Sequence, residues 1–371
     1  MAPFRSSLAS ARLLSRGVIL FALLALALTA AQPAKAAQET KEKTTFKVAW
    51  SIYVGWMPWD YAGQSGILKK WADKYGIKIE LTQINDYVES INQYTAGKYD
   101  ACVMTNMDAL TIPAAGGVDS TALIVGDYSN GNDGIVLKGT GKKLADIKGQ
   151  NINLVELSVS HYLLARGLDS IGLAEKDIKV VNTSDADMVA AFAAPTVTSV
   201  VTWKPLLSEI TAVPKTSLVF DSSKTPGEIL DLMIVNSEVL KANPKLGKAL
   251  VGAWYETMAL MQGKDAKTTA ALESMAKASG TDLAGFKAQL ATTYMYWTPA
   301  SAVTATTSPD LVKKMDLVRK FSFDHGLLGE GAKTVDVVGI AFPGGTTLGN
   351  KANVKMRFDT SYMKMAADGT L

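Results

Sequence analysis

The sequence predicts an α/β protein of two lobes, each a mostly parallel sheet flanked by helices, joined by crossing strands. Strand-like and helix-like segments alternate from residue 46 to about residue 231, an order typical of parallel sheets with right-handed crossovers. The alternation runs through twice, near 46–130 and near 134–231, before the chain becomes mainly helical. Of the 371 residues, 48% are hydrophobic and 20% charged, as in ordinary globular proteins.

The first unit contains the following expected elements in order. Alternating or β-branched runs indicate its strands, and apolar residues at helical spacing indicate its helices. They are a strand at 46–51, an aromatic loop at 53–60, a helix at 61–75, a strand at 77–81, a helix at 86–94 and a strand at 101–104. Asp86 stands where an N-cap is expected.

The second unit repeats this pattern. Its expected strands are 134–137, 151–155, 178–181 and 199–202, and its expected helices are 144–149, 158–173 and 188–194. A further strand at 232–235 precedes helical runs at 258–275 and 309–323. We therefore expect a first lobe at 46–131, a second lobe at 132–234, and a largely helical segment at 235–371 that returns over the first lobe.

The first 36 residues have the pattern of a cleavable secretory signal. Three arginines precede an apolar run at 17–28, and the small-residue motif Ala34-Lys35-Ala36 follows. The run is shorter than the ~20 residues that span a bilayer, which favours cleavage near Ala36 over a membrane anchor. No cysteine stands directly after the apolar run, which argues against a lipid anchor. We expect a periplasmic protein with a flexible leader at 37–45.

Charge and rare residues exclude several classes of function. Removing the four cationic residues of the signal changes the formal net charge from +3 to −1, so no basic patch favours nucleic acid. The single cysteine, Cys102, fits a buried apolar position. His161 and His325 are the only histidines, and they do not have the spacing of a zinc site. We expect no metal and no cofactor.

Two lobes joined by crossing strands predict a ligand cleft at the carboxyl ends of the strands, closed by hinge motion. The motifs of dinucleotide-binding proteins, P-loop NTPases and serine hydrolases are absent. Neither histidine has an obvious nucleophile beside it. A binding protein is therefore favoured over an enzyme.

A series of short segments points to a known family by its order and spacing. The segments are Val48–Trp50, Gly55–Pro58, Ala62–Ile67, Ala96–Ala101, Asp133–Val136, Leu144–Gly149, Ser158–Tyr162, Trp203–Pro205 and Val235–Ser237. In them the chain resembles the nitrate/sulfonate/taurine class of ABC-importer substrate-binding proteins. The resemblance implies a two-lobed, type II-like periplasmic-binding-protein fold without catalysis, acting as a monomer with an ABC permease and its ATPase.

The residues at the expected cleft differ from those of an anion site. Family members that bind sulfonate or nitrate are expected to hold the anion at the N-terminus of the second-lobe helix, where this chain has Glu156. Asp108 follows the third strand, and aromatic residues surround the same mouth. Carboxylates and aromatic faces together suit guanidinium. The candidate ligand-binding residues are Glu156, Asp108, Trp59, Trp56, Trp203, Tyr53, Asn106, Asp86, Ser158 and His161.

These departures resemble the urea carboxylase-associated branch of the class, which implies guanidine or urea as ligand. Other interpretations remain open. Glu156, Asp108 and Asp86 can serve as helix caps, and Trp59 and Trp203 can be core residues. Asp127 and Asp133 flank the crossing, where hinge turns are the default role. The ligand can instead be a small anion such as taurine, an alkanesulfonate or nitrate. An enzyme of the same fold, such as a pyrimidine-precursor synthase, and a two-lobed sensor domain are further alternatives.

Overall fold

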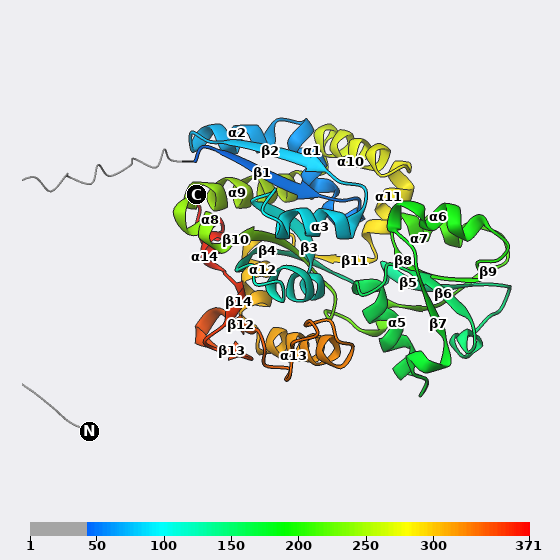
Figure 1. Cartoon of the computed structure of the whole chain (residues 1–371). Coiled ribbons are helices and arrows are strands. Elements are labelled where there is room, and N and C mark those ends of the chain that lie inside the picture. Colours follow the sequence, from blue (N-terminus) through cyan, green and yellow to red (C-terminus); the bar gives the residue numbers. More distant parts are fainter. Residues whose placement is uncertain (1–42) are drawn as a thin grey trace, which may run out of the picture. The chain divides into compact units, whose positions relative to one another are not determined.

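The computed structural model describes residues 43–371. The expected signal peptide and residues 37–42 of the expected leader lie outside this range. The end of the leader was placed too late, because Thr45 already begins the first strand. No helix in the described part of the chain is long and apolar enough to cross a bilayer. The described residues form one unit that contains two sheets (Figure 1).

The larger sheet is the centre of the first lobe. It has nine strands in the order β13-β12-β14-β4-β10-β3-β1-β2, and β11 pairs with β4 outside this path. The strands are β1 (Thr45–Trp50), β2 (Lys78–Gln83), β3 (Ala101–Thr105), β4 (Ser120–Ser129), β10 (Leu230–Asn236), β11 (Thr293–Met295), β12 (Gly339–Ala341), β13 (Thr347–Leu348) and β14 (Val354–Phe358). β1 pairs in parallel with both β2 and β3, which confirms the predicted βαβαβ start.

Helices and short helical turns cover this sheet. They are η1 (Val54–Trp56), α1 (Met57–Gln64), α2 (Ile67–Lys74), α3 (Tyr87–Thr95), α4 (Asn106–Ala109), η2 (Leu110–Ala114), α8 (Ser237–Ala242), α9 (Pro244–Met261), α10 (Ala266–Ala278), α11 (Leu283–Leu290), α12 (Pro299–Thr306), α13 (Pro309–Asp324), η6 (Pro343–Gly345) and α14 (Ser361–Ala367). The single helix expected at 61–75 was wrong. Gly66, with φ of 83°, separates α1 from α2, because glycine adopts this left-handed conformation without steric cost.

The smaller sheet is the centre of the second lobe. Its five strands have the order β7-β6-β8-β5-β9. They are β5 (Asp133–Lys138), β6 (Asn151–Leu154), β7 (Lys179–Asn182), β8 (Ser199–Trp203) and β9 (Thr216–Asp221). Around them lie η3 (Leu144–Ile147), α5 (Val159–Asp169), η4 (Glu175–Asp177), α6 (Asp185–Ala193), α7 (Leu206–Thr211) and η5 (Ser222–Lys224).

Both sheets are more mixed than the sequence predicts. β10 runs antiparallel to β3 and β4, and β5 runs antiparallel to β8 and β9. These are the strands by which the chain enters a new lobe, so they join each sheet in the opposite direction. The second lobe also ends earlier than expected. Residues 230–234 lie in β10 and pair in the larger sheet.

The two crossings between the lobes are tied together by hydrogen bonds. The hydroxyl groups of Ser129 and Ser222 lie 2.6 Å apart, and the Gly131 N–H donates to Ser222 Oγ at 2.8 Å. Asn132 Nδ2 donates to Thr293 Oγ1 of β11 at 2.9 Å. The crossing from β4 to β5 is therefore held by both the return crossing and the C-terminal third of the chain.

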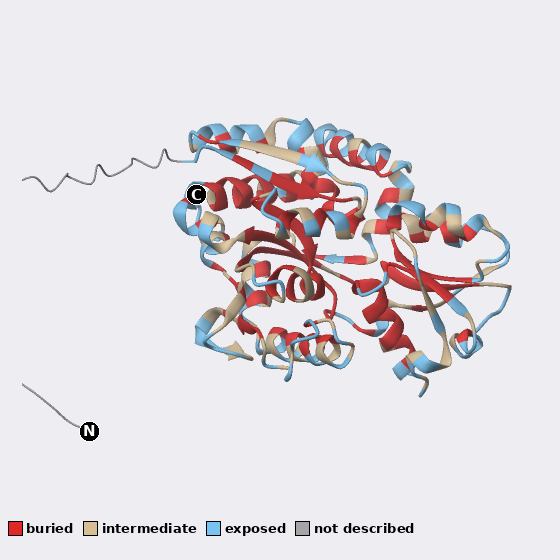
Figure 2. Cartoon of the chain, viewed as in Figure 1, coloured by how far each residue is buried: buried red, intermediate tan, exposed pale blue. Residues whose placement is uncertain are grey.

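Buried residues concentrate in the strands of both sheets and along α9 (Figure 2). The C-terminal third returns to the first lobe as expected, because β12, β13 and β14 extend the larger sheet and α9 packs on α1 and α2. Trp59 of α1 stacks on Trp254 of α9 with ring centroids 5.0 Å apart, and both side chains are buried. This stack joins the start of the first lobe to its returning segment.

We predict that Trp254→Ala lowers the free energy of unfolding by about 3–5 kcal/mol, because it leaves a cavity beside Trp59 in a core that cannot collapse fully. Urea denaturation of the ligand-free protein measures the change. Leu317→Ala is the control, since Leu317 is 48% exposed and such substitutions change stability by less than about 0.5 kcal/mol. Equal effects of the two substitutions would contradict the packing role of the stack.

Candidate ligand-binding site

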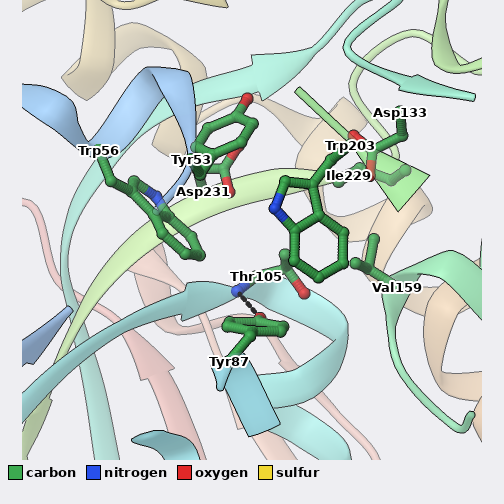
Figure 3. A pocket seen from close by; sticks show the side chains of 9 residues that line it. All are labelled: Tyr53, Trp56, Tyr87, Thr105, Asp133, Val159, Trp203, Ile229 and Asp231. Carbon is green, nitrogen blue, oxygen red and sulfur yellow. Dashed lines mark hydrogen bonds between the residues drawn. The ribbon is translucent and has the colours of Figure 1, made fainter. Parts of the chain in front are cut away.

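A small cavity of about 20 Å³ lies where the two lobes meet. This is roughly the space of one water molecule and far below the ~300–1,000 Å³ of pockets for drug-sized ligands, so even a small solute would have to move the wall residues apart. Figure 3 shows its aromatic side chains arranged around the same space. The residues that line it are Tyr53, Trp56, Tyr87, Thr105, Asp133, Val159, Trp203, Ile229 and Asp231.

Four aromatic rings form most of the wall. Tyr53 and Trp56 come from the loop after β1, Tyr87 begins α3, and Trp203 ends β8. Neighbouring ring centroids lie 5.1 Å apart for Tyr53–Trp56 and 5.6 Å apart for both Trp56–Tyr87 and Tyr87–Trp203. Trp203 Nε1 also donates to the Ile52 carbonyl at 3.3 Å. These contacts join the rings of the two lobes into one wall.

Two carboxyl groups, those of Asp133 and Asp231, reach the cavity wall (Figure 3). Asp133 begins β5 and accepts a hydrogen bond from Ser129 Oγ. Burial raises the pKa of Asp133 to about 7. Burial, together with the charge of Asp127, raises the pKa of Asp231 well above its usual value. The neutral form of each carboxyl group is favoured when nothing in the site balances its charge.

Asp127 lies behind Asp231, since the two residues are direct partners across the β4–β10 pair, and each carboxyl group affects the pKa of the other. Asp127 Oδ1 also accepts from the Tyr53 hydroxyl at 3.1 Å. Gly55 makes this close approach feasible, since a Cβ there would lie 2.8 Å from Asp127 Oδ2 and 2.4 Å from the Tyr53 ring. Burial raises the pKa of Asp127 to about 7. We call Asp127, Asp133 and Asp231 the carboxyl cluster.

Asp108 supports the wall from behind. Its Oδ2 accepts from the Tyr87 hydroxyl at 2.7 Å and from Thr105 Oγ1 at 2.8 Å. Burial raises its pKa to about 6, although hydrogen bonds from Tyr87, Thr105 and the Val159 backbone act in the opposite direction. Val159 is the first residue of α5, so a first-lobe carboxyl group faces the N-terminus of the second-lobe helix. The alternative role of Asp108 as a helix cap is not seen, because Thr105 caps α4 and no side chain caps the following turn η2.

No lysine, arginine or histidine is among the described residues that line the cavity. Two basic side chains that are close in sequence to lining residues pair with other groups. Lys204 follows Trp203 and donates to Thr292 Oγ1 at 3.1 Å, and Arg166 of α5 pairs with Glu228 at 2.9 Å. The cavity therefore combines aromatic faces and acidic groups without a basic side chain.

The structure brings only part of the predicted site together. Tyr53, Trp56 and Trp203 line the cavity. Trp59 lies one layer behind, against Trp254. Asn106 is buried between the Glu228 carbonyl and the Leu230 N–H, at 3.0 and 2.9 Å.

The remaining predicted residues lie outside the cavity lining. The Glu156 side chain is exposed, and its backbone N–H donates to Asn182 Oδ1 at 3.0 Å. Asp86 caps α3, accepting from the Glu89 N–H at 2.9 Å. Ser158 caps α5, accepting from the Ser160 N–H at 3.2 Å. In this arrangement Asp86 and Ser158 cap helices, and the Glu156 side chain lies outside the cavity lining.

The site predicted from the sequence does not include Tyr87, Thr105, Val159, Ile229 or Asp231, and a hinge turn was the default role expected of Asp133. One signal was available for Asp231. It interrupts the apolar run Leu230-Asp231-Leu232-Met233-Ile234-Val235, and a charged residue inside a buried strand indicates a functional or paired position. Asp127 and Asp133 stand at the expected crossing, and Asp133 there forms part of the cavity wall.

His161 belongs to a separate bridge between the lobes. Its Nδ1 accepts from the Leu157 N–H at 3.1 Å, and its Nε2 lies 3.0 Å from Glu175 Oε1. His325, which follows α13 of the first lobe, places Nδ1 3.0 Å from the same oxygen. Hydrogen bonds from His161 and His325 lower the pKa of Glu175 to about 2, and Glu175 raises the pKa of His325.

This bridge predicts a pH-dependent effect of Glu175→Gln. Because the pKa of Glu175 is lowered, its ionised form stabilises the fold above the ordinary pKa of 4.5, and this stabilisation is lost on acidification. Because the pKa of His325 is raised, its protonated form stabilises the fold below the ordinary pKa of 6.5, and this stabilisation is lost as pH rises. We expect a loss of about 1 kcal/mol at pH 5.5, limited by solvent screening, and a smaller loss at pH 8.5. Urea denaturation with exposed Glu330→Gln as control tests this, and an equal loss at both pH values would contradict it.

Comparison with known proteins gives relatives that are named as binding proteins. A putative binding protein of Brucella abortus is 26% identical over 151 residues, which are 40% of this chain and 46% of that protein. The taurine-binding periplasmic protein of Escherichia coli is 23% identical over 144 residues, 38% of this chain and 44% of that protein. The chain thus aligns with less than half the length of either relative.

Solved structures agree with the two-lobed architecture. The alkanesulfonate-binding protein SsuA of Xanthomonas axonopodis pv. citri, bound to MOPS, superposes with a TM-score of 0.64 at 20% identity, covering 78% of this chain and 96% of that one. This confirms the predicted fold of the periplasmic binding proteins. The sequence model of the NMT1-like family matches residues 39–276. This is more than half of the sequence, and the chain therefore belongs to the NMT1-like family.

Proposed function

We propose that the protein is the solute-binding subunit of an ABC importer and that its ligand is a small, nitrogen-rich cation of the guanidinium type. It captures the solute between its lobes in the periplasm, as a monomer, and delivers it to the permease and ATPase. The family and the names of the relatives support the role of binding subunit. The cavity between the lobes supports the choice of ligand.

The observation that carries this choice is the pairing of Asp133 and Asp231 with four aromatic rings in a cavity without a basic side chain. A buried carboxylate is costly unless an opposite charge and hydrogen-bond donors compensate it. A guanidinium ion supplies both, because its planar N–H groups pair with carboxylates. Its flat faces stack favourably on Trp and Tyr rings. Urea has the same planar shape and donor groups without the charge, so it binds more weakly.

A small anion is the second candidate, because one relative is named for taurine and a structural neighbour for alkanesulfonate. An anion of this kind is best held at a helix N-terminus or by a basic side chain. Here the Asp108 carboxyl already faces the first N–H of α5, and Asp133 and Asp231 would repel an anion whenever they are ionised. An anion could bind only with these groups protonated.

An enzyme of the same fold receives less support. A pyrimidine-precursor synthase or another enzyme would need a nucleophile or a general base in the cavity. Among the described lining residues there is no histidine and no cysteine, and the carboxyl groups of Asp133 and Asp231 are the candidates for a general base. His161 and His325 are both engaged with Glu175, and Cys102 is buried in β3 with its thiol pKa raised to about 12 by burial.

A ligand panel tests the sign of the ligand's charge. Guanidinium and methylguanidinium at millimolar concentration should raise the melting temperature, because a ligand that binds only the folded state stabilises it. Urea should act more weakly, and taurine, nitrate and methanesulfonate should have no effect. Sodium chloride at matched concentration controls for ionic strength. Stabilisation by the anions alone would overturn the proposed ligand class.

Substitutions at the wall test which carboxyl groups hold the cation. Asp133→Asn and Asp231→Asn should each weaken guanidinium binding by about tenfold or more, since a hydrogen bond to a charged group contributes roughly 1.5–3 kcal/mol. Asp73→Asn removes the same charge from an exposed position and is the matched control. Calorimetry should give Glu156→Gln nearly unchanged affinity. Loss of binding in Glu156→Gln, with Asp231→Asn unaffected, would place the ligand at the mouth of α5.

A further inference from the structure

The carboxyl cluster contains more acidic groups than a monovalent cation can neutralise. Asp133 and Asp231 line the cavity, whereas Asp127 is fully buried behind Asp231 and does not reach the lining. Asp127 contacts the Asp231 side chain and the Tyr53 hydroxyl, and through them it touches two residues of the wall. The role of Asp127 is therefore not to contact the ligand.

We infer that Asp127 is a positioning residue that makes the uptake of a cation release a proton, because it shares that proton with Asp231 when the cavity is empty. Two carboxyl groups in contact cannot both ionise without a nearby positive charge. The empty site keeps one proton between Asp127 and Asp231. When the cation pairs with Asp231, it supplies the missing positive charge, and the shared proton leaves to solvent. No bond other than that O–H bond is broken. This inference rests on the proposed function.

The surroundings of the pair are consistent with this exchange. The titratable groups that act on Asp127 and Asp231 are Tyr53 from the loop after β1, Asp133 from β5 and Tyr296 after β11. Asp108 of α4 acts on Asp133 in turn. Thr293 of β11 lies 3.4 Å from the Tyr53 hydroxyl and carries no charge. None of these groups is a cation, so no side chain of the cluster can take over the role of the proton.

The direction of the pH effect follows from the same groups. The pKa values of Asp127 and Asp133 are about 7, raised by burial from 3.8, and that of Asp231 is also raised. Raised carboxyl pKa values mean that the empty folded protein holds protons between pH 4 and 7 that the unfolded chain has lost, so ionisation destabilises the fold as pH rises. A cation favours the ionised form, so its affinity must increase over the same rise in pH.

The experiment is calorimetric titration of the mature protein with guanidinium chloride, which keeps its charge throughout, from pH 5.5 to pH 8.5. We expect the affinity to increase about tenfold or more between pH 6 and pH 8. At pH 6.5, titrations in buffers of different ionisation enthalpy should show close to one proton released per cation. Affinity that is independent of pH, with no proton released, would overturn the inference and leave the proposed function intact.

Asp127→Asn separates the proposed role from simple structural support. The substitution preserves shape but removes the like charge beside Asp231, so Asp231 ionises at lower pH. Relative to wild type, binding should be stronger at pH 6 and weaker at pH 8, with less proton release. Uniform weakening at every pH would instead indicate structural damage and contradict the inference.

The wild-type proton count does not depend on the folding of this variant, so the inference remains testable without it. Asp73→Asn, at the exposed position used above, should reproduce the wild-type profile. Absence of any guanidinium binding between pH 5.5 and pH 8.5 would overturn both the proposed function and the coupling. Anion binding that strengthens as pH falls would do the same.

Discussion

The site depends on one electrostatic constraint, the burial of Asp108, Asp127, Asp133 and Asp231 at the junction of the lobes with no basic side chain in the cavity wall. Each carboxyl group is excluded from water and has its pKa raised by burial. Hydroxyl groups of Tyr53, Tyr87, Thr105 and Ser129 supply hydrogen bonds, but they supply no charge. The neutral forms of these carboxyl groups are favoured when no positive charge is near, and in the function proposed above a cation supplies that charge.

The fold places these buried carboxyl groups at the junction of the lobes, where a bound ligand can influence how the lobes close. Asp127 lies near the end of β4, Asp133 begins β5 on the other side of the crossing, and Asp231 lies on the returning strand β10. The cluster therefore lies on the crossing strands themselves. Trp203 contacts Tyr87 and the Ile52 carbonyl across the lobes, so the aromatic wall is complete only when the lobes are together. A cation bound here would contact both lobes at once.

Local signals predicted much of the fold, because they are encoded in neighbouring residues. The alternation of β1, α3 and β3, the Asp86 cap and the α5 start at Ser158 follow from periodicity and capping chemistry. The helix break at Gly66 was missed because glycine inside a helical pattern is ambiguous. The assignment of 230–234 to the second lobe failed because a strand's own sequence does not specify which sheet it joins. Three of the four predicted aromatic residues, Tyr53, Trp56 and Trp203, line the cavity, since loops at strand ends meet at one edge. Glu156 was predicted to contact the ligand, but its side chain is exposed. The sequence does not reveal this, because one turn of backbone decides whether a side chain faces the cavity or solvent.

The most direct test of cation binding at the carboxyl cluster is a crystal structure of the mature protein grown with methylguanidinium at neutral pH. We expect a planar ligand between Trp56, Tyr87 and Trp203, with its N–H groups within hydrogen-bond distance of the Asp133 and Asp231 carboxylates. The exposed Glu156 side chain would make no contact with it. An empty carboxyl-lined cavity, with the ligand or a buffer anion at the N-terminus of α5, would contradict the account.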